Sequence, residues 1–142
     1  MNIYLCSRVA KDAHEMNNAV AKALRELGHS VFVPHEQHYN QIMAGTAHLV
    51  EDVTIYCQDM DAMLEAELCV VVGRVGVDCA FEVGWFQGAQ VPTYWYKPVG
   101  PDYGRHPMLY AIPPYTDISA LVAAIAKDLN TRTVGKLLYN KG

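Results

Sequence analysis

The sequence predicts an α/β fold: a doubly wound parallel sheet of four to five strands flanked by helices. Short apolar runs rich in β-branched and aromatic residues alternate with longer segments of helical periodicity, which is the order of a parallel sheet with crossover helices. The run Leu68–Val72 (LCVVV) is apolar throughout, which is typical of a strand covered on both faces. The chain has 142 residues and shows no repeat, so we expect one domain over residues 1–142.

The N-terminal segments predict a strand, a helix and a second strand. Asn2–Cys6 is a short apolar run and is expected to be the first strand. Lys11–Leu27 has apolar residues on one helical face, and Gly28 is placed to end that helix. Ser30–Pro34 (SVFVP) is the second strand, and it should pair in parallel with the first because a helix connects them.

The middle of the chain repeats this alternation. His35–Gly45 is polar and irregular and is expected to be a loop, whereas Thr46–Glu65 has the 3–4 spacing of a helix. Leu68–Val72 follows as the third strand. Gly73–Asp78 is then expected to be a loop and Cys79–Gln87 a short helix.

The last third of the chain is less regular. Pro92–Tyr96 (PTYWY) is expected to be the fourth strand, and Lys97–Pro107, with its prolines and glycines, a loop and a candidate lid. Met108–Ile112 is the candidate fifth strand, and Asp117–Leu129 is a helix by its periodicity. The tail from Asn130 shows no clear pattern. The complete order is that of a doubly wound, flavodoxin- or Rossmann-like sheet.

The composition of the chain argues against some binding partners and some cellular locations. The formal net charge is −4, and the Lys and Arg residues are scattered rather than clustered, which argues against binding to nucleic acid polymers. The four cysteines form no CxxC pair and favour reduced thiols in a cytoplasmic protein. We expect no signal peptide and no membrane association, because the N-terminus lacks a basic start and no apolar run is long enough to span a bilayer.

Glu82 is the strongest candidate for chemistry. In a doubly wound sheet, ligands bind beyond the carboxyl ends of the strands, where this sequence places Ser7 and Arg8, the segment from His35 to Tyr39, and the segment from Gly73 to Glu82. Glu82 lies one turn into the expected short helix, inside the apolar stretch DCAFEVGWF. A carboxylate in such surroundings is either paired structurally or used.

The segment around Glu82 resembles the nucleoside 2-deoxyribosyltransferase family, which includes N-glycosidases of nucleoside 5′-monophosphates. Asp78–Gly84 (DCAFEVG) is similar to the family's nucleophile signature, and the opening IYLC is similar to its first strand. The resemblance spans roughly residues 2–128. It implies that Glu82 is the nucleophile, that Tyr4 hydrogen-bonds it, and that Asp59 contacts the base.

The resemblance also suggests how substrates are bound, with some roles left open. Asp78, four residues before Glu82, either takes the family's sugar-binding acid role or leaves it vacant, since the expected position holds Gly76. Asp59 or Asp78 would protonate the departing base. The remaining candidates are substrate contacts, with Gln37 and His38 for the base, Met108 for a segment reaching a neighbouring subunit's site, and Ser7, Arg8, Arg105 and His106 for a phosphate.

Three functions follow from these residues. The first is transfer of the sugar between bases through a glycosyl-enzyme on Glu82, and the second is hydrolysis of a nucleoside 5′-monophosphate, which differs only in that water attacks the intermediate. The third is a nucleotide sensor without catalysis. The resemblance implies a homo-oligomer with a shared active site. Because carboxylates carry the chemistry, no organic cofactor is expected, and no metal site is expected either, since His35 and His38 lack an evident third ligand.

Overall fold

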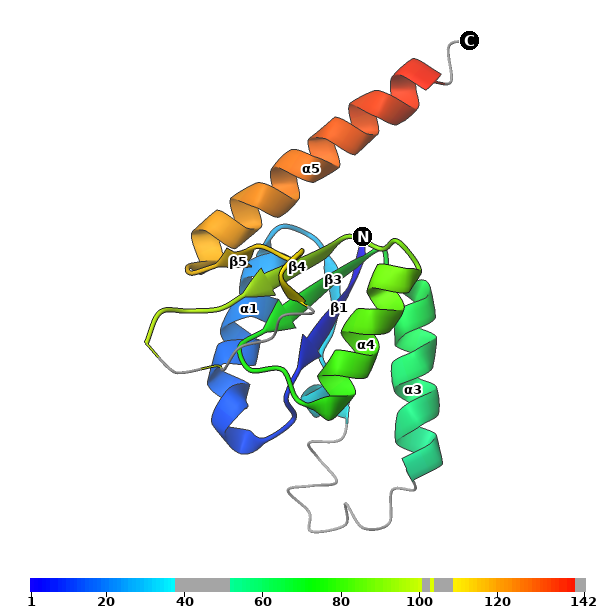
Figure 1. The fold of residues 1–142 in the computed structure, drawn as a ribbon. Coiled ribbons are helices and arrows are strands. Elements are labelled where there is room, and N and C mark those ends of the chain that lie inside the picture. The colour runs from blue at the N-terminus through cyan, green and yellow to red at the C-terminus, as the bar shows by residue number, and fades with distance from the viewer. Residues whose placement is uncertain (38–51, 101–102, 104–108, 140–142) are drawn as a thin grey trace.

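A five-stranded, all-parallel sheet forms the centre of the molecule (Figure 1). The computed structural model describes residues 1–37, 52–100, 103 and 109–139, and it describes side chains as far as Asn130. The spatial order of the strands is β2-β1-β3-β4-β5, and each neighbouring pair is parallel. The strands are β1 (Asn2–Ser7), β2 (Ser30–Phe32), β3 (Leu68–Val72), β4 (Thr93–Tyr96) and β5 (Pro114–Tyr115).

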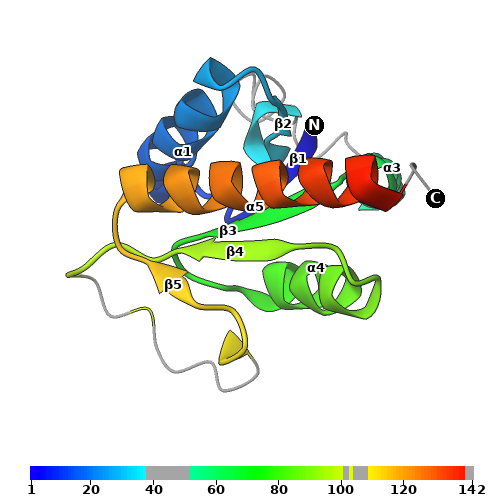
Figure 2. The same cartoon turned by 90° about the horizontal axis from the view of Figure 1, so that it is seen from above.

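Helices cover both faces of this sheet, as Figure 2 shows from above. α1 and α5 pack on one face, and α3 and α4 pack on the other. The helices are α1 (His14–Glu26), preceded by a 3-10 turn at Lys11–Ala13, α3 (Asp52–Glu65), α4 (Val77–Gly88) and α5 (Ile118–Tyr139). This is the doubly wound α/β architecture that the sequence predicts. No helix in the described ranges has both the length and the apolar character that crossing a membrane requires.

The alternation of side chains along the strands divides the interior into two cores. In β1, Ile3 and Leu5 point to the α1–α5 side, whereas Tyr4 and Cys6 point to the α3–α4 side. The continuous apolar run of β3 is explained in the same way, because all five of its residues are buried on one side or the other.

Strand order reverses between β1 and β3. The chain leaves β1 for β2 on one side and returns to β3 on the other. In such sheets the helices that follow the two strands diverge and leave a crevice at the carboxyl ends. The fold therefore predicts a ligand site beside Ser7, the last residue of β1.

Several expectations for individual elements are confirmed. Gly28 adopts a φ of 84° after α1, and its N–H donates to the Arg25 carbonyl at 2.9 Å, so it ends the helix as expected. The predicted pairing of the first two strands is also present, with Ile3 opposite Val31. All four cysteines are free thiols.

Several boundaries differ from the sequence-based expectation. Residues 34–37 form a helical turn rather than loop, and α4 begins at Val77, two residues early. The fifth strand is Pro114–Tyr115, not Met108–Ile112, of which residues 109–112 form turns. A two-residue strand is too short to show alternation, so the sequence gives no signal for it.

The tail from Asn130 shows no clear pattern in the sequence, but α5 continues through it to Tyr139. Figure 1 shows the end of α5 running past the sheet, so this part of the helix has no sheet beneath it. An amphipathic period arises where a helix packs on a core. Its absence from the tail explains why the sequence gives no helical signal there.

Candidate active site

A cavity of about 870 Å³ opens at the carboxyl end of β1. Its walls come from the loop that follows β1, from Pro34, and from helices α3 and α4. The polar lining residues are Ser7, Arg8, Asp52, Asp59, Asp78 and Glu82, with Gly76 and Cys79 beside them. The apolar lining residues are Val9, Ala10, Pro34, Ile55, Tyr56, Met60, Met63, Val77 and Phe81.

Glu82 lies in this cavity and is held by Tyr4. The Tyr4 hydroxyl donates a hydrogen bond of 3.0 Å to Glu82 Oε1, and both residues are buried. Glu82 Oε2 is also buried and has no hydrogen-bond partner among the described residues. Tyr4 is itself fixed by ring contacts with Phe32 and Phe86, at centroid distances of 5.3 and 5.4 Å. One carboxylate oxygen is therefore positioned by Tyr4, and the described residues leave the other without a hydrogen bond.

Burial dominates the electrostatics of this carboxylate and raises the pKa of Glu82 to about 7. The Cys6 thiol and the Tyr4 hydroxyl act in the opposite direction, and the charges of Asp59 and Asp78 raise the pKa further. Burial, together with the Glu82 charge, raises the pKa of the Tyr4 phenol far above its usual range, so this group stays a neutral donor.

The two other candidate acids reach the cavity from different elements. Asp59 comes from α3, and Asp78 lies in the first turn of α4. Both are close enough to influence the charge of Glu82. The structure thus brings Asp59 of α3 together with Asp78 and Glu82, which are four residues apart on α4.

Of the other residues predicted to contact substrate, some line the cavity and others do not or lie outside the described residues. Ser7, Arg8 and Gly76 line the cavity, and the buried Ser7 hydroxyl has no hydrogen-bond partner among the described residues. Gln37 is exposed at the end of the 34–37 turn and does not line the cavity within the described residues. The residues predicted to read the base, to bind phosphate or to reach a neighbouring subunit, namely His38, Arg105, His106 and Met108, lie outside the described residues.

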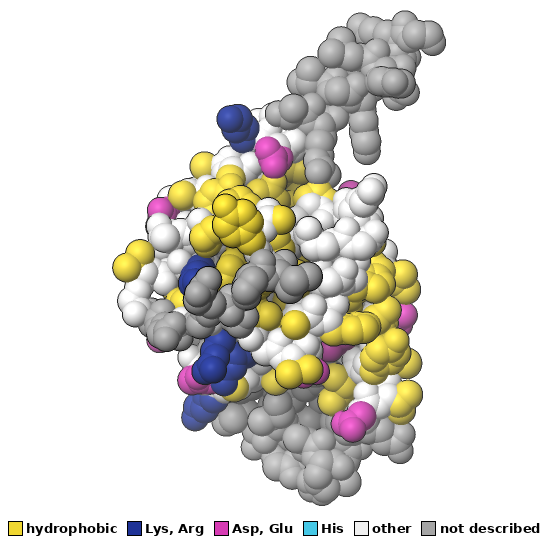
Figure 3. Space-filling view, viewed as in Figure 1, with side chains coloured by type: hydrophobic (Ala, Val, Ile, Leu, Met, Phe, Trp, Pro, Cys, Tyr) yellow, Lys and Arg dark blue, Asp and Glu magenta, His cyan; other side chains and the backbone are white. Residues whose placement is uncertain are grey.

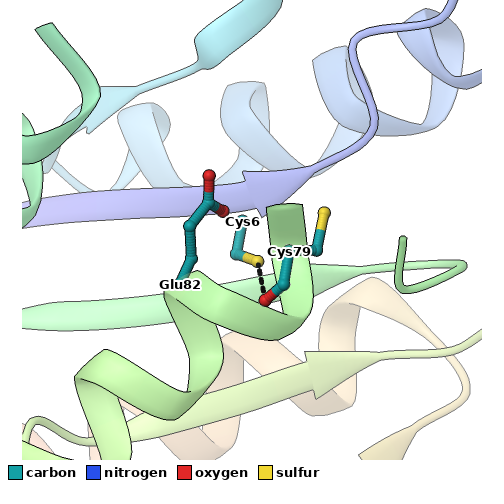
Figure 4. A group of neighbouring side chains, drawn as sticks. All are labelled: Cys6, Cys79 and Glu82. Carbon is teal, nitrogen blue, oxygen red and sulfur yellow. Dashed lines mark hydrogen bonds between the residues drawn. The ribbon is translucent and has the colours of Figure 1, made fainter. Parts of the chain in front are cut away.

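Two cysteines beside Glu82 are the part of the site that sequence reasoning missed. The Sγ atoms of Cys6 and Cys79 and a carboxylate oxygen of Glu82 lie within 4.8 Å of one another (Figure 4). Cys79 is three residues before Glu82 on the same helix, which was a usable signal. The contact of Cys6 with α4 depends on how the helix packs against β1, which no local pattern reveals.

The outer part of the site is apolar. Tyr56 and Phe81 line the cavity and are also more than half exposed, at 56 % and 57 %. Figure 3 shows hydrophobic side chains gathered over α3 and α4 on this face of the molecule. A flat aromatic or apolar ligand group would therefore find partners at the cavity mouth.

Comparison with known proteins identifies the family of the chain. A family model described as nucleoside 2-deoxyribosyltransferase matches residues 3–131. The chain belongs to this family. The nucleoside 2-deoxyribosyltransferase family consists of enzymes that act on nucleosides and nucleobases by glycosyl transfer. The sequence-based assignment to the family is therefore confirmed.

A solved structure shows the same fold. The chain is similar to a 2-deoxyribosyltransferase from the psychrotolerant bacterium Bacillus psychrosaccharolyticus, with a TM-score of 0.67 and 20 % identity. The match covers 84 % of this chain and 89 % of that one. Comparison with proteins of curated function finds no match. At this identity, the structural likeness concerns the fold, and the activity has to be argued from the site.

Proposed function

We propose that the protein is a nucleoside 2-deoxyribosyltransferase that uses Glu82 as its nucleophile. One observation carries the proposal: a buried carboxylate lines the cavity, with one oxygen held by Tyr4 at 3.0 Å and the other without a hydrogen-bond partner in the described part of the chain. A nucleophile must be held in place and must also keep a lone pair available, and this arrangement meets both needs.

The reaction proceeds in two displacements. Glu82 Oε2 attacks the anomeric carbon of a nucleoside, the bond from that carbon to the base nitrogen breaks, and a glycosyl ester forms on the enzyme. The departing base takes a proton from Asp59 or Asp78, the two acids beside Glu82. A second base then attacks the same carbon through a ring nitrogen, returns its N–H proton to the acid that protonated the first base, and frees the Glu82 carboxylate. The negative charge of Glu82 also stabilises the oxocarbenium-like transition state.

The base lies against the apolar lining of the cavity in this proposal. Tyr56 and Phe81 offer aromatic surface, and Asp59 offers a hydrogen-bonding partner on the same side. The sugar lies deeper, between Glu82 and Asp78. No organic cofactor enters either displacement.

The test is a chromatographic assay with each nucleoside and deoxynucleoside, with and without a free acceptor base. A new nucleoside that forms only with acceptor is the expected result. Glu82→Gln keeps the shape and an acceptor for Tyr4, yet it should reduce turnover by several orders of magnitude because an amide is a poor nucleophile. Turnover by this variant near that of the wild type would rule out Glu82 as the nucleophile.

Hydrolysis of nucleoside 5′-monophosphates is the second candidate, favoured by the Ser7–Arg8 corner of the cavity. The Ser7 hydroxyl is buried without a partner in the described structure, and Arg8 lines the same cavity while pairing with Asp12 at 3.1 Å. A guanidinium and a hydroxyl are suitable donors to a phosphate.

Arg8→Ala tests this second candidate. It should weaken the binding of monophosphates and leave nucleosides unaffected. Asp12→Asn is the matched control, because it removes the same ion pair but keeps the guanidinium. Equal losses on nucleosides and monophosphates would exclude a phosphate role. A nucleotide that binds to the wild type but is never consumed would instead indicate a sensor.

We further propose that the protein is a cytoplasmic homo-oligomer. Three of the four free thiols are buried, which fits a reducing compartment. Exposed apolar side chains on α3 and α4 border the cavity, and a second copy of the chain could cover them. Light scattering coupled to size-exclusion chromatography should give a mass at least twice that of one chain, and a monomer would contradict this proposal.

A further inference from the structure

Two thiols meet a carboxylate that lines the cavity, and the reaction proposed above uses only the carboxylate. Cys6, Cys79 and Glu82 are 0 %, 5 % and 9 % exposed. Their ligand atoms lie within 4.8 Å of one another. A group so compact, built from two separate elements, needs an explanation beyond the packing of small side chains.

The backbone holds this cluster together. Cys79 and Glu82 are three residues apart on α4 and therefore share one face of the helix. Cys6 comes from β1, and its Sγ donates to the Cys79 carbonyl oxygen at 3.5 Å, which joins the strand to the first turn of the helix (Figure 4). The three ligands are thus positioned by secondary structure rather than by loops.

The donor set selects one class of ion. Two thiolates and one carboxylate suit Zn²⁺, whereas Mg²⁺ and Ca²⁺ require oxygen ligands. Zinc–sulfur bonds of about 2.3 Å in a tetrahedron place two sulfurs roughly 3.8 Å apart. The cluster would have to close by at most about 1 Å to reach that spacing.

A second observation points to a ligand at the same place. Glu82 Oε2 is buried and has no hydrogen-bond partner among the described residues. Cys79 and Glu82 also line the cavity, so an ion can enter from that side, and a fourth coordination position would face the cavity, where water can bind.

We propose that Cys6, Cys79 and Glu82 bind one Zn²⁺ ion, and that the bound ion inhibits the enzyme by occupying its carboxylate. On binding, the two thiols release their protons to solvent and nothing is oxidised. Three anionic ligands around the ion leave a net charge of −1. Binding of the ion is independent of the proposed function, whereas inhibition rests on Glu82 being the nucleophile.

Binding is tested with Zn²⁺ and the reduced, full-length protein. Competition with a chromophoric chelator gives the affinity and stoichiometry, and Co²⁺ substitution reports thiolate ligation through charge-transfer absorption. Cys6→Ala, Cys79→Ala and Glu82→Gln are compared with Cys57→Ser, the control that removes an exposed thiol on α3. Circular dichroism establishes that each variant is folded.

We expect one Zn²⁺ per chain, cobalt–thiolate absorption, and unchanged binding in Cys57→Ser. Losing a direct ligand should weaken binding by at least ~10-fold in the other three variants, since even outer partners of a ligand contribute that much. Equal affinity in wild type and in Cys6→Ala and Cys79→Ala, or no binding at all, would overturn the site.

Inhibition is tested in the transfer assay. Zn²⁺ should inhibit competitively with nucleoside, chelator should reverse the inhibition, and Mg²⁺ should have no effect. Full activity of the zinc-loaded enzyme would overturn the inhibitory role. A protein that binds Zn²⁺ through both cysteines but never transfers a sugar would leave the metal site intact and refute the proposed function alone.

Discussion

The Glu82 carboxylate is subject to two opposing influences. Burial favours its protonated form, while the nearby Cys6 thiol and the hydrogen bond from Tyr4 favour the charged form, and the resulting pKa is about 7. In the proposed reaction, the charged form is the nucleophile. Around neutral pH the protein therefore holds a substantial fraction of Glu82 ready to react, in a place where an unpaired charge is costly.

The pH dependence of the reaction should report this balance. We expect kcat/KM to rise with pH through about 7, because Glu82 must lose its proton before it attacks. Tyr4→Phe removes a hydrogen bond to the charged form, so the rising limb should move to higher pH. Measuring kcat/KM against pH for the wild type and Tyr4→Phe tests this. A rising limb at the same pH in both proteins would show that Tyr4 does not favour the charged form of Glu82.

The same carboxylate should lower stability at high pH. Its folded-state pKa, about 7, is above the ordinary value of 4.5, so stability falls as pH rises from 4.5 through 7. At about 1.4 kcal/mol per pKa unit, raising the pKa from 4.5 to about 7 corresponds to a loss of about 3.5 kcal/mol. Glu82→Gln should then be more stable than wild type at pH 8 and nearly equal at pH 4.5, as measured by denaturant unfolding. A difference independent of pH would contradict this account.

At the scale of elements, Asn17 of α1 joins two segments that wall the cavity. Its Nδ2 donates to the Arg8 carbonyl oxygen at 2.9 Å and lies 3.3 Å from His35 Nδ1. His35 Nε2 is 3.1 Å from Asn18 Oδ1, so His35 accepts at one ring nitrogen and donates at the other, which describes a neutral imidazole. Burial and the neighbouring His14 lower the pKa of His35, which agrees with a neutral ring.

Asn17→Ala should therefore destabilise the fold by about 1–3 kcal/mol, because a buried imidazole nitrogen and a carbonyl lose their donor. Asn18→Ala is the matched control. Asn18 is exposed, so water can replace its contact with His35 and the loss should be smaller. Thermal unfolding of both variants measures the difference. Similar losses would show that the Asn17 hydrogen bonds contribute little.

At the scale of the whole molecule, the sheet separates two hydrophobic cores, and one of them adjoins Glu82. Tyr4, Cys6 and Phe86 belong to the core between the sheet and α3–α4, which also holds Glu82. Leu121 and Ile125 of α5 belong to the opposite core, against α1. Tyr4 and Glu82, to which the proposed reaction assigns roles, are thus both packed on one face of the sheet.

This separation predicts different outcomes for two buried residues. Leu121→Ala should cost about 2–5 kcal/mol of stability with kcat/KM unchanged below the unfolding range. Phe86→Ala should cost a similar amount and also reduce kcat/KM, since Phe86 packs on the Tyr4 ring. Denaturant unfolding curves and kcat/KM values of both variants test these two expectations. A loss of kcat/KM in folded Leu121→Ala would show that the two cores are coupled.

The sequence predicts this architecture better than it predicts the site. Strands such as Leu68–Val72 are uninterrupted apolar runs, so their positions are confirmed to within a residue or two. The Tyr4–Glu82 contact, by contrast, was available only through family resemblance, because 78 residues separate the pair. The closeness of Cys6 to Glu82 and the apolar wall depend on how helices lie on the sheet, which is decided by packing.

The edges of the sheet have a consequence for behaviour in concentrated solution. Its outermost strands are its shortest, with three residues in β2 and two in β5, and β5 begins with Pro114, which has no N–H to offer. An incoming strand from another molecule would find few backbone groups to pair with at either edge. We therefore expect this parallel sheet to resist edge-to-edge aggregation even where crowding brings many copies together.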